Sequence, residues 1–136
     1  MKTEFITPEI DNCQNFVRQV KNLIEDKKMY LKPNLSKNDI VKMMHEDNGD
    51  ILKFCNSFNQ QIFENYLNKL RMTHAAILFL GNNSYLYSIE VIGKESGFNT
   101  YESFCKTCEL LTGMLPEMLR EVVRTKRSLK GIFDNN

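Results

Sequence analysis

The chain has 136 residues, 42% of them hydrophobic, and 18 Lys and Arg against 17 Asp and Glu. These values fit one ordinary globular domain, or two very small ones that share a core, and argue against wholesale disorder. A net charge of +1 does not by itself point to nucleic acid. No apolar run approaches the roughly 20 residues that cross a bilayer. The N-terminus also lacks a secretory signal, so we expect a cytoplasmic protein with no membrane partner.

Two of the four cysteines form a Cys-x-x-Cys pattern, Cys105 and Cys108. A zinc site would need a second such pair or two histidines at ligand spacing, whereas His45 and His74 stand alone. We therefore expect no metal and no other cofactor. No strand is predicted ahead of Cys105, so buried apolar cysteine is the favoured interpretation and a redox thiol pair the weaker one.

Helical periodicity dominates the chain and predicts an all-α fold. Thr7 with Pro8 begins an amphipathic helix that should stop near Leu31, because Pro33 disfavours helical dihedrals just before it. This helix either packs on the rest of the chain or pairs two chains into a homodimer. The weak strand candidate is residues 85–93.

The middle of the chain predicts two short helices and a long one. Ser36 and Asp39 form a capping-box pair at the start of the first, and residues 51–55 supply the apolar set of the second. A long helix is expected from Phe63 to Leu80. Its apolar stripe consists of Phe63, Tyr66, Leu67, Leu70 and Ile77.

Three more helices are predicted in the last third. Ser88 caps a short one, and Asn99 with Glu102 forms a capping pair that begins another, which reaches about Leu111. The final helix is expected over residues 116–131.

Two parts of this pattern resemble each other, since each is a short helix, a turn with glycine and a second helix. Val41 and Leu52 are eleven positions apart, and so are Gly93 and Phe104. A small or β-branched residue against an apolar one is typical of a tight helix-turn-helix, whose second helix fits the major groove of DNA.

The chain from about Tyr30 to Arg120 resembles the AraC/XylS family of bacterial transcription activators, specifically its C-terminal DNA-binding domain. The resemblance rests on Tyr66-Leu67-Asn68-x-Leu70-Arg71-Met72-x-x-Ala75-x-x-Leu78, on Ser88-Ile89-Glu90-x-Ile92 with Gly97-Phe98, and on Phe104, Lys106 and Thr112-Gly113-Met114-x-Pro116. Leu115 stands where the family usually has a capping Thr, and Glu109 where it often has a basic residue.

This resemblance implies two homeodomain-like helix-turn-helix subdomains joined by a long linker helix, with their second helices in adjacent major grooves. The expected boundaries are 1–31 for the N-terminal helix, 32–62 for the first subdomain, 63–80 for the linker and 81–136 for the second subdomain. The implied partners are double-stranded DNA and RNA polymerase. The implied function is sequence-specific binding that regulates transcription, without catalysis.

The candidate DNA-binding residues are Asn48, Lys53, Asn99, Thr100, Tyr101 and Lys106. Mutual capping of Asn99 and Glu102, and an ordinary solvated Lys106, are open alternatives. Asp47 and Asp50 place two carboxylates in the first motif, where phosphates would be repelled. The alternative function is therefore a protein-interaction module that has kept the helix-turn-helix fold and lost DNA binding.

Overall fold

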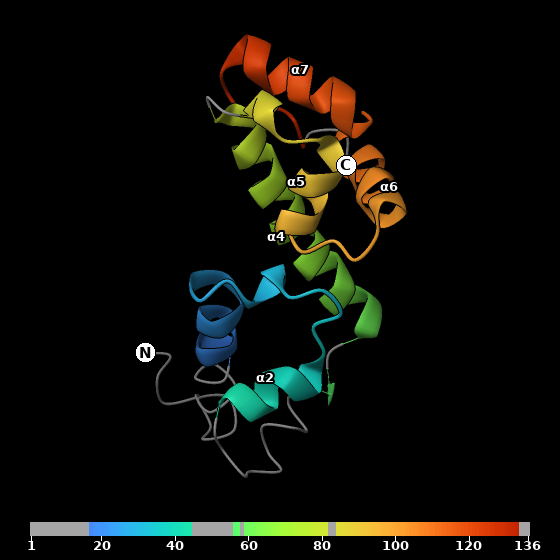
Figure 1. Ribbon diagram of the computed structural model, residues 1–136. Helices are drawn as coiled ribbons and strands as arrows, with labels where there is room; N and C mark the ends of the chain where they lie inside the picture. The colour runs from blue at the N-terminus through green and yellow to red at the C-terminus, as the bar shows by residue number, and fades with distance from the viewer. Residues whose placement is uncertain (1–16, 45–55, 58, 82–83, 134–136) are drawn as a thin grey trace, which may run out of the picture. The chain divides into compact units, whose positions relative to one another are not determined.

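The computed structural model describes residues 17–44, 56–57, 59–81 and 84–133, and every regular element in these ranges is a helix (Figure 1). The all-α prediction is thus confirmed for this part of the chain, and residues 85–93 form no strand. The elements are η2 (Asn22–Asp26), η3 (Met29–Leu31), α2 (Lys37–Met43), α4 (Gln60–Leu80), η4 (Ser84–Leu86), α5 (Ile89–Glu95), α6 (Tyr101–Thr112) and α7 (Pro116–Lys126). The predicted start at Thr7 and Pro8 and the helix over residues 51–55 lie outside the described ranges.

Contacts along the chain divide it into two compact units. The first consists of residues 1–29 and 34–63, and the second of residues 30–33 and 64–136. The short segment from Tyr30 to Pro33 therefore belongs with the second unit, although both of its flanks belong to the first.

In the first unit, the N-terminal helix ends earlier than predicted. Its last turn is the π-helical η2, which stops at Asp26, and Lys28 adopts a left-handed φ of 59°. The prediction of an end near Leu31 was wrong, because Pro33 limits only how far a helix can continue. The capping box before α2 is confirmed: Ser36 Oγ accepts from the Asp39 amide at 3.1 Å, and Asp39 Oδ2 accepts from the Ser36 amide at 3.0 Å.

Helix α4 begins three residues before its predicted start because Asn59 caps it. The Asn59 carboxamide oxygen accepts from the amides of Gln61 at 2.7 Å and Ile62 at 3.3 Å. One member of the predicted stripe is wrong, since Ile77 is 53% exposed. In the C-terminal half of α4, the fully buried positions are Met72, Ala75, Ala76 and Phe79.

These four residues form the centre of the core of the second unit. Helices α5, α6 and α7 gather around the C-terminal part of α4 (Figure 1). The other buried members are Ile89, Ile92, Phe98, Phe104, Cys108, Leu119, Val123 and Ile132. Because every one of these helices contributes to a single cluster, the position of each is fixed by close packing with the others.

Helix α7 is shorter than predicted and has no side-chain cap. It ends at Lys126, where Arg127 takes a left-handed φ of 53°, and not at Gly131. Pro116 occupies its first turn as expected, but Leu115, at the N-cap position, makes no side-chain hydrogen bond to the helix. A leucine cannot accept the amide hydrogen bond that a threonine would accept there.

A buried arginine holds the segment from Tyr30 to Pro33 in the second unit. Arg71, only 6% exposed, donates from Nε to the Tyr30 carbonyl at 2.7 Å and from Nη2 to the Lys32 carbonyl at 2.9 Å. Burial lowers the pKa of Arg71, and the Glu64 carboxylate opposes that shift. The guanidinium still stays charged at neutral pH, so both hydrogen bonds are charge-assisted.

This geometry predicts that Arg71→Lys destabilises the protein although it keeps the charge. An ammonium group lacks the rigid fork that serves two carbonyls, so one buried carbonyl loses its partner. We expect the free energy of unfolding to fall by about 1–3 kcal/mol in urea denaturation. The exposed Lys69→Ala on the same helix is the control, with a change within about 0.5 kcal/mol. Equal stability of the two variants would contradict this role.

Candidate functional site

Helices α5 and α6 approach each other more closely than side chains normally permit. A Cβ atom at Gly93 of α5 would lie 2.6 Å from Cδ2 of Phe104 on α6, and Phe104 is fully buried. The sequence pattern predicted a small residue of one helix packed against an apolar residue of the next, and Gly93 and Phe104 make this contact directly. Because Gly93 has no side chain, α5 and α6 can pack at this short distance, and the contact fixes the position of one helix against the other.

The turn between α5 and α6 is closed by Gly97 and Phe98. Gly97 has a φ of +97°, which strains any residue with a side chain, and the Phe98 amide donates to the Gly93 carbonyl at 3.1 Å. The Phe98 ring is buried, 5.0 Å from the Phe104 ring between centroids. Gly97 therefore forms the turn, and Phe98 is its apolar anchor in the core.

The capping residues of α6 differ from the prediction by one position. Thr100 Oγ1 accepts from the Ser103 amide at 3.0 Å, and the Thr100 amide donates to Ser103 Oγ at 3.4 Å. The capping pair of Asn99 and Glu102 was wrong, and α6 begins at Tyr101. Accepting one hydrogen bond leaves the Thr100 hydroxyl proton for another acceptor.

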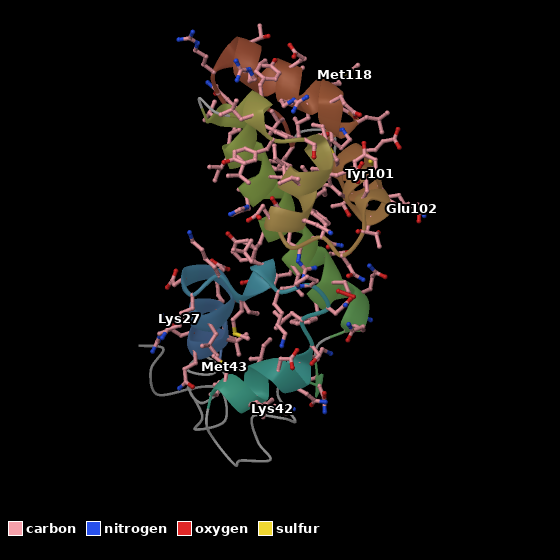
Figure 2. All side chains as sticks on the ribbon, viewed as in Figure 1. Lys27, Lys42, Met43, Tyr101, Glu102 and Met118 are labelled. Carbon is pink, nitrogen blue, oxygen red and sulfur yellow. The ribbon has the colours of Figure 1, made fainter. Side chains whose placement is uncertain are left out.

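Four of the candidate DNA-binding residues lie around the start and exposed side of α6. Asn99 and Thr100 are exposed immediately before the helix, and Tyr101 and Lys106 are exposed on it. Figure 2 shows Tyr101 and its neighbour Glu102 on the outer side of α6. Asn48 and Lys53, the candidates of the first motif, lie outside the described residues.

A carboxylate on α7 contacts Tyr101, and the sequence analysis missed it. The Tyr101 hydroxyl donates to Glu117 Oε2 at 3.3 Å. The pKa of Tyr101 is raised to about 12, first by its interaction with the Cys105 side chain, then by burial and by the Glu117 charge. The phenol therefore stays a neutral hydrogen-bond donor at physiological pH. Glu117 is sixteen residues away on another helix, so no local pattern reveals the pair.

The exposed side of α6 is not uniformly basic. It carries Glu102, Lys106 and Glu109, and Leu110 is 65% exposed beside them. These three charges sum to −1, so the favourable electrostatic contribution to binding an anion depends on Lys106 and on the backbone amides of the first turn.

The two close cysteines lie in different environments. Cys108 is fully buried, its Sγ 3.7 Å from the Thr112 hydroxyl, whereas Cys105 is partly exposed. Burial raises the pKa of the Cys108 thiol to about 11, although its hydrogen bond to Thr112 opposes that shift. The interpretation of Cys108 as a core residue is confirmed.

Within the described ranges, His, Cys, Asp and Glu do not gather in any group of three that could hold a metal ion. None of the helices described there combines the length and the apolar character that a membrane span requires. His74 is half-buried, with Nδ1 3.1 Å from Ser96 Oγ and its ring edge-on to Tyr30.

In comparisons with known proteins, no protein-family model, no curated protein and no solved structure matches the chain.

The contact at Gly93 predicts that Gly93→Ala destabilises the protein, although alanine favours helices. The added methyl overlaps a fully buried ring, so the ring or the helices must shift, which costs about 1–3 kcal/mol. Thermal and urea unfolding measure the loss, and Lys94→Ala on the same helix is the control. Phe104→Leu should cost less stability in the Gly93→Ala background than in the parent, because the smaller side chain relieves the overlap. A Gly93→Ala variant more stable than the parent would contradict the contact.

The burial of Cys108 predicts slow alkylation. A thiol pKa near 11, against 9 for the unperturbed group, leaves about 100-fold less thiolate at pH 8. We expect iodoacetamide to modify Cys108 at least about 100-fold more slowly in the folded protein than in urea. Trypsin cleaves after Lys106 and separates Cys105 from Cys108, so mass spectrometry reads each residue alone. Rapid alkylation of Cys108 in the folded protein would show that it is a reactive thiol.

Proposed function

We propose that this protein binds double-stranded DNA sequence-specifically, with α5 and α6 as a helix-turn-helix and α6 as the helix that enters the major groove. The observation that carries the proposal is the contact of Gly93 with Phe104 across a turn closed by Gly97. A contact this close between two consecutive helices leaves the outer side of the second helix free for a groove.

The side chains at the start of α6 support the same function. Asn99, Thr100 and Tyr101 place a carboxamide, a hydroxyl and a phenol at the end of the helix that helix-turn-helix proteins direct at base edges. Lys106, one turn further along, has the charge and reach to contact a phosphate. The exposed Thr100 hydroxyl keeps its proton for a donor contact, whereas the Tyr101 phenol donates to Glu117 and can still accept a hydrogen bond.

The resemblance to the AraC/XylS family extends the proposal to transcription. On this basis the protein is a transcription regulator of the activator type, with RNA polymerase as a second partner. Its architecture would be two homeodomain-like subdomains joined by α4, a helix of 21 residues and about 31 Å. Base contacts by the first motif depend on Asn48 and Lys53.

A second candidate is a protein-interaction module with the same fold. It is favoured by the composition of the exposed side of α6, where Glu102 and Glu109 oppose phosphates and Leu110 exposes an apolar side chain. Such a module would bind no DNA sequence in preference to another.

Two experiments together separate the two functions. The first is selection from a random double-stranded DNA library, and the second is measurement of affinity at several salt concentrations. A DNA-binding protein enriches a common sequence, and its affinity falls steeply between about 50 and 200 mM salt because counterions are released. Failure to enrich any sequence, together with affinity independent of salt, would remove the DNA proposal.

Single variants test the roles of the α6 residues on the selected sequence. Lys106→Ala should weaken binding to all sequences alike and reduce the slope of log K against log salt by about 0.9, as expected for one lost phosphate contact. Tyr101→Ala should change the preference among sites. The control is Lys126→Ala at the end of α7, an exposed lysine remote in sequence from α6. Wild-type affinity, slope and preference in both α6 variants would refute the assignment.

A further inference from the structure

The end of α7 that is remote from α6 forms a second exposed surface together with η4. We define the η4–α7 surface as Tyr85, Leu86, Tyr87, Arg120, Glu121 and Arg124. Helix α7 begins near α6 and ends on the other side of the second unit, beside η4 (Figure 1). This surface is therefore distinct from the residues assigned above to DNA.

Two arginines lie against one exposed tyrosine in this surface. The guanidinium carbon of Arg124 is 3.7 Å from the centroid of the Tyr85 ring, and that of Arg120 is 5.0 Å from it. The Tyr85 hydroxyl donates to the Glu121 carboxylate, and Arg120 Nη1 donates to the Tyr87 carbonyl at 3.3 Å. These contacts hold the long arginine side chains in place, which reduces the entropy that a partner must remove on binding.

Apolar side chains lie beside the arginines. Tyr85, Leu86 and Tyr87 are three consecutive exposed residues, and Leu86 is 76% exposed. Tyrosine and arginine are, with tryptophan, the residues most enriched among those that dominate protein interfaces. A sugar-phosphate backbone offers little apolar surface to such a leucine, whereas another protein can bury it.

The charge of this part of α7 indicates the chemistry of the partner. Residues 120–127 contain four basic side chains, Arg120, Arg124, Lys126 and Arg127, and one acidic side chain, Glu121. This local excess of three positive charges stands out in a chain whose total is +1. Complementary potentials guide association, so the fitting surface is acidic around an apolar centre.

We propose that the η4–α7 surface docks an acidic amphipathic segment of another protein. Apolar side chains of that segment cover Leu86 and Tyr87, and its carboxylates pair with Arg124 and with the basic end of α7. Docking there leaves the exposed side of α6 accessible.

A peptide selection tests the proposal. A random peptide library is displayed in vitro, and the 136-residue protein is the bait, with no DNA present. We expect enriched peptides to combine Asp and Glu with apolar residues at helical spacing. Their affinity, measured by fluorescence anisotropy, should fall at least about tenfold in Leu86→Ser and in Arg124→Gln, and should decrease with salt. The matched control is Ile62→Ser, which removes an apolar side chain that is 61% exposed near the start of α4 and should leave affinity unchanged.

Three results would overturn the inference. The first is a selection that yields no peptide dependent on Leu86 and Arg124. The second is enrichment of peptides without acidic residues. The third is a loss of DNA affinity and a smaller salt slope in Arg124→Gln, which would assign the surface to the DNA backbone. Because the peptide selection uses no DNA, its outcome is independent of whether α6 binds DNA.

Discussion

The close contact between Gly93 and Phe104 is the constraint on which the second unit depends. The Phe104 ring occupies the space that a side chain at position 93 would need, and it packs on Phe98. The Phe98 amide in turn bonds back to the Gly93 carbonyl, which closes the turn. The same contact that completes the core thus decides where α6 begins and which of its residues a partner can reach. Any side chain at position 93 would alter the core and the proposed interface together.

A second constraint holds the turn between α5 and α6 against another part of the second unit. The Tyr30 carbonyl accepts the Arg71 Nε hydrogen bond and also lies 2.6 Å from where a Cβ on Gly97 would be. Gly97 is therefore required for two reasons, its positive φ and its lack of a side chain. Residues at positions 30, 71 and 97, far apart in sequence, define one local structure. This arrangement explains why a charged guanidinium is buried there, since it is the group that joins two carbonyls of the preceding segment to α4.

The sequence predicted those features that depend on neighbouring residues. The capping box at Ser36 and the Ser88 cap are both present, because each needs only the few residues around it. The start of α6 was misplaced by one residue because Asn99 with Glu102 and Thr100 with Ser103 both fit a capping pair. Tertiary packing decides which of the two pairs caps α6, since Phe104 must face Gly93. The exposure of Ile77 and the contact of Tyr101 with Glu117 depend on how helices meet, and no local period encodes that.

Helix α7 links the two proposed interfaces in one rigid element. Glu117 accepts from the Tyr101 hydroxyl at one end, and Glu121, four residues later, accepts from the Tyr85 hydroxyl. The surroundings of the two tyrosines differ in charge, because Tyr101 contacts the carboxylate of Glu117, whereas Tyr85 also lies against two arginines. From Glu117 to Arg124 the helix rises about 10 Å, so a duplex on α6 and an acidic segment on η4 would be held at a fixed short separation. A partner recruited to the η4–α7 surface would then be placed next to the DNA without any change in the conformation of the second unit.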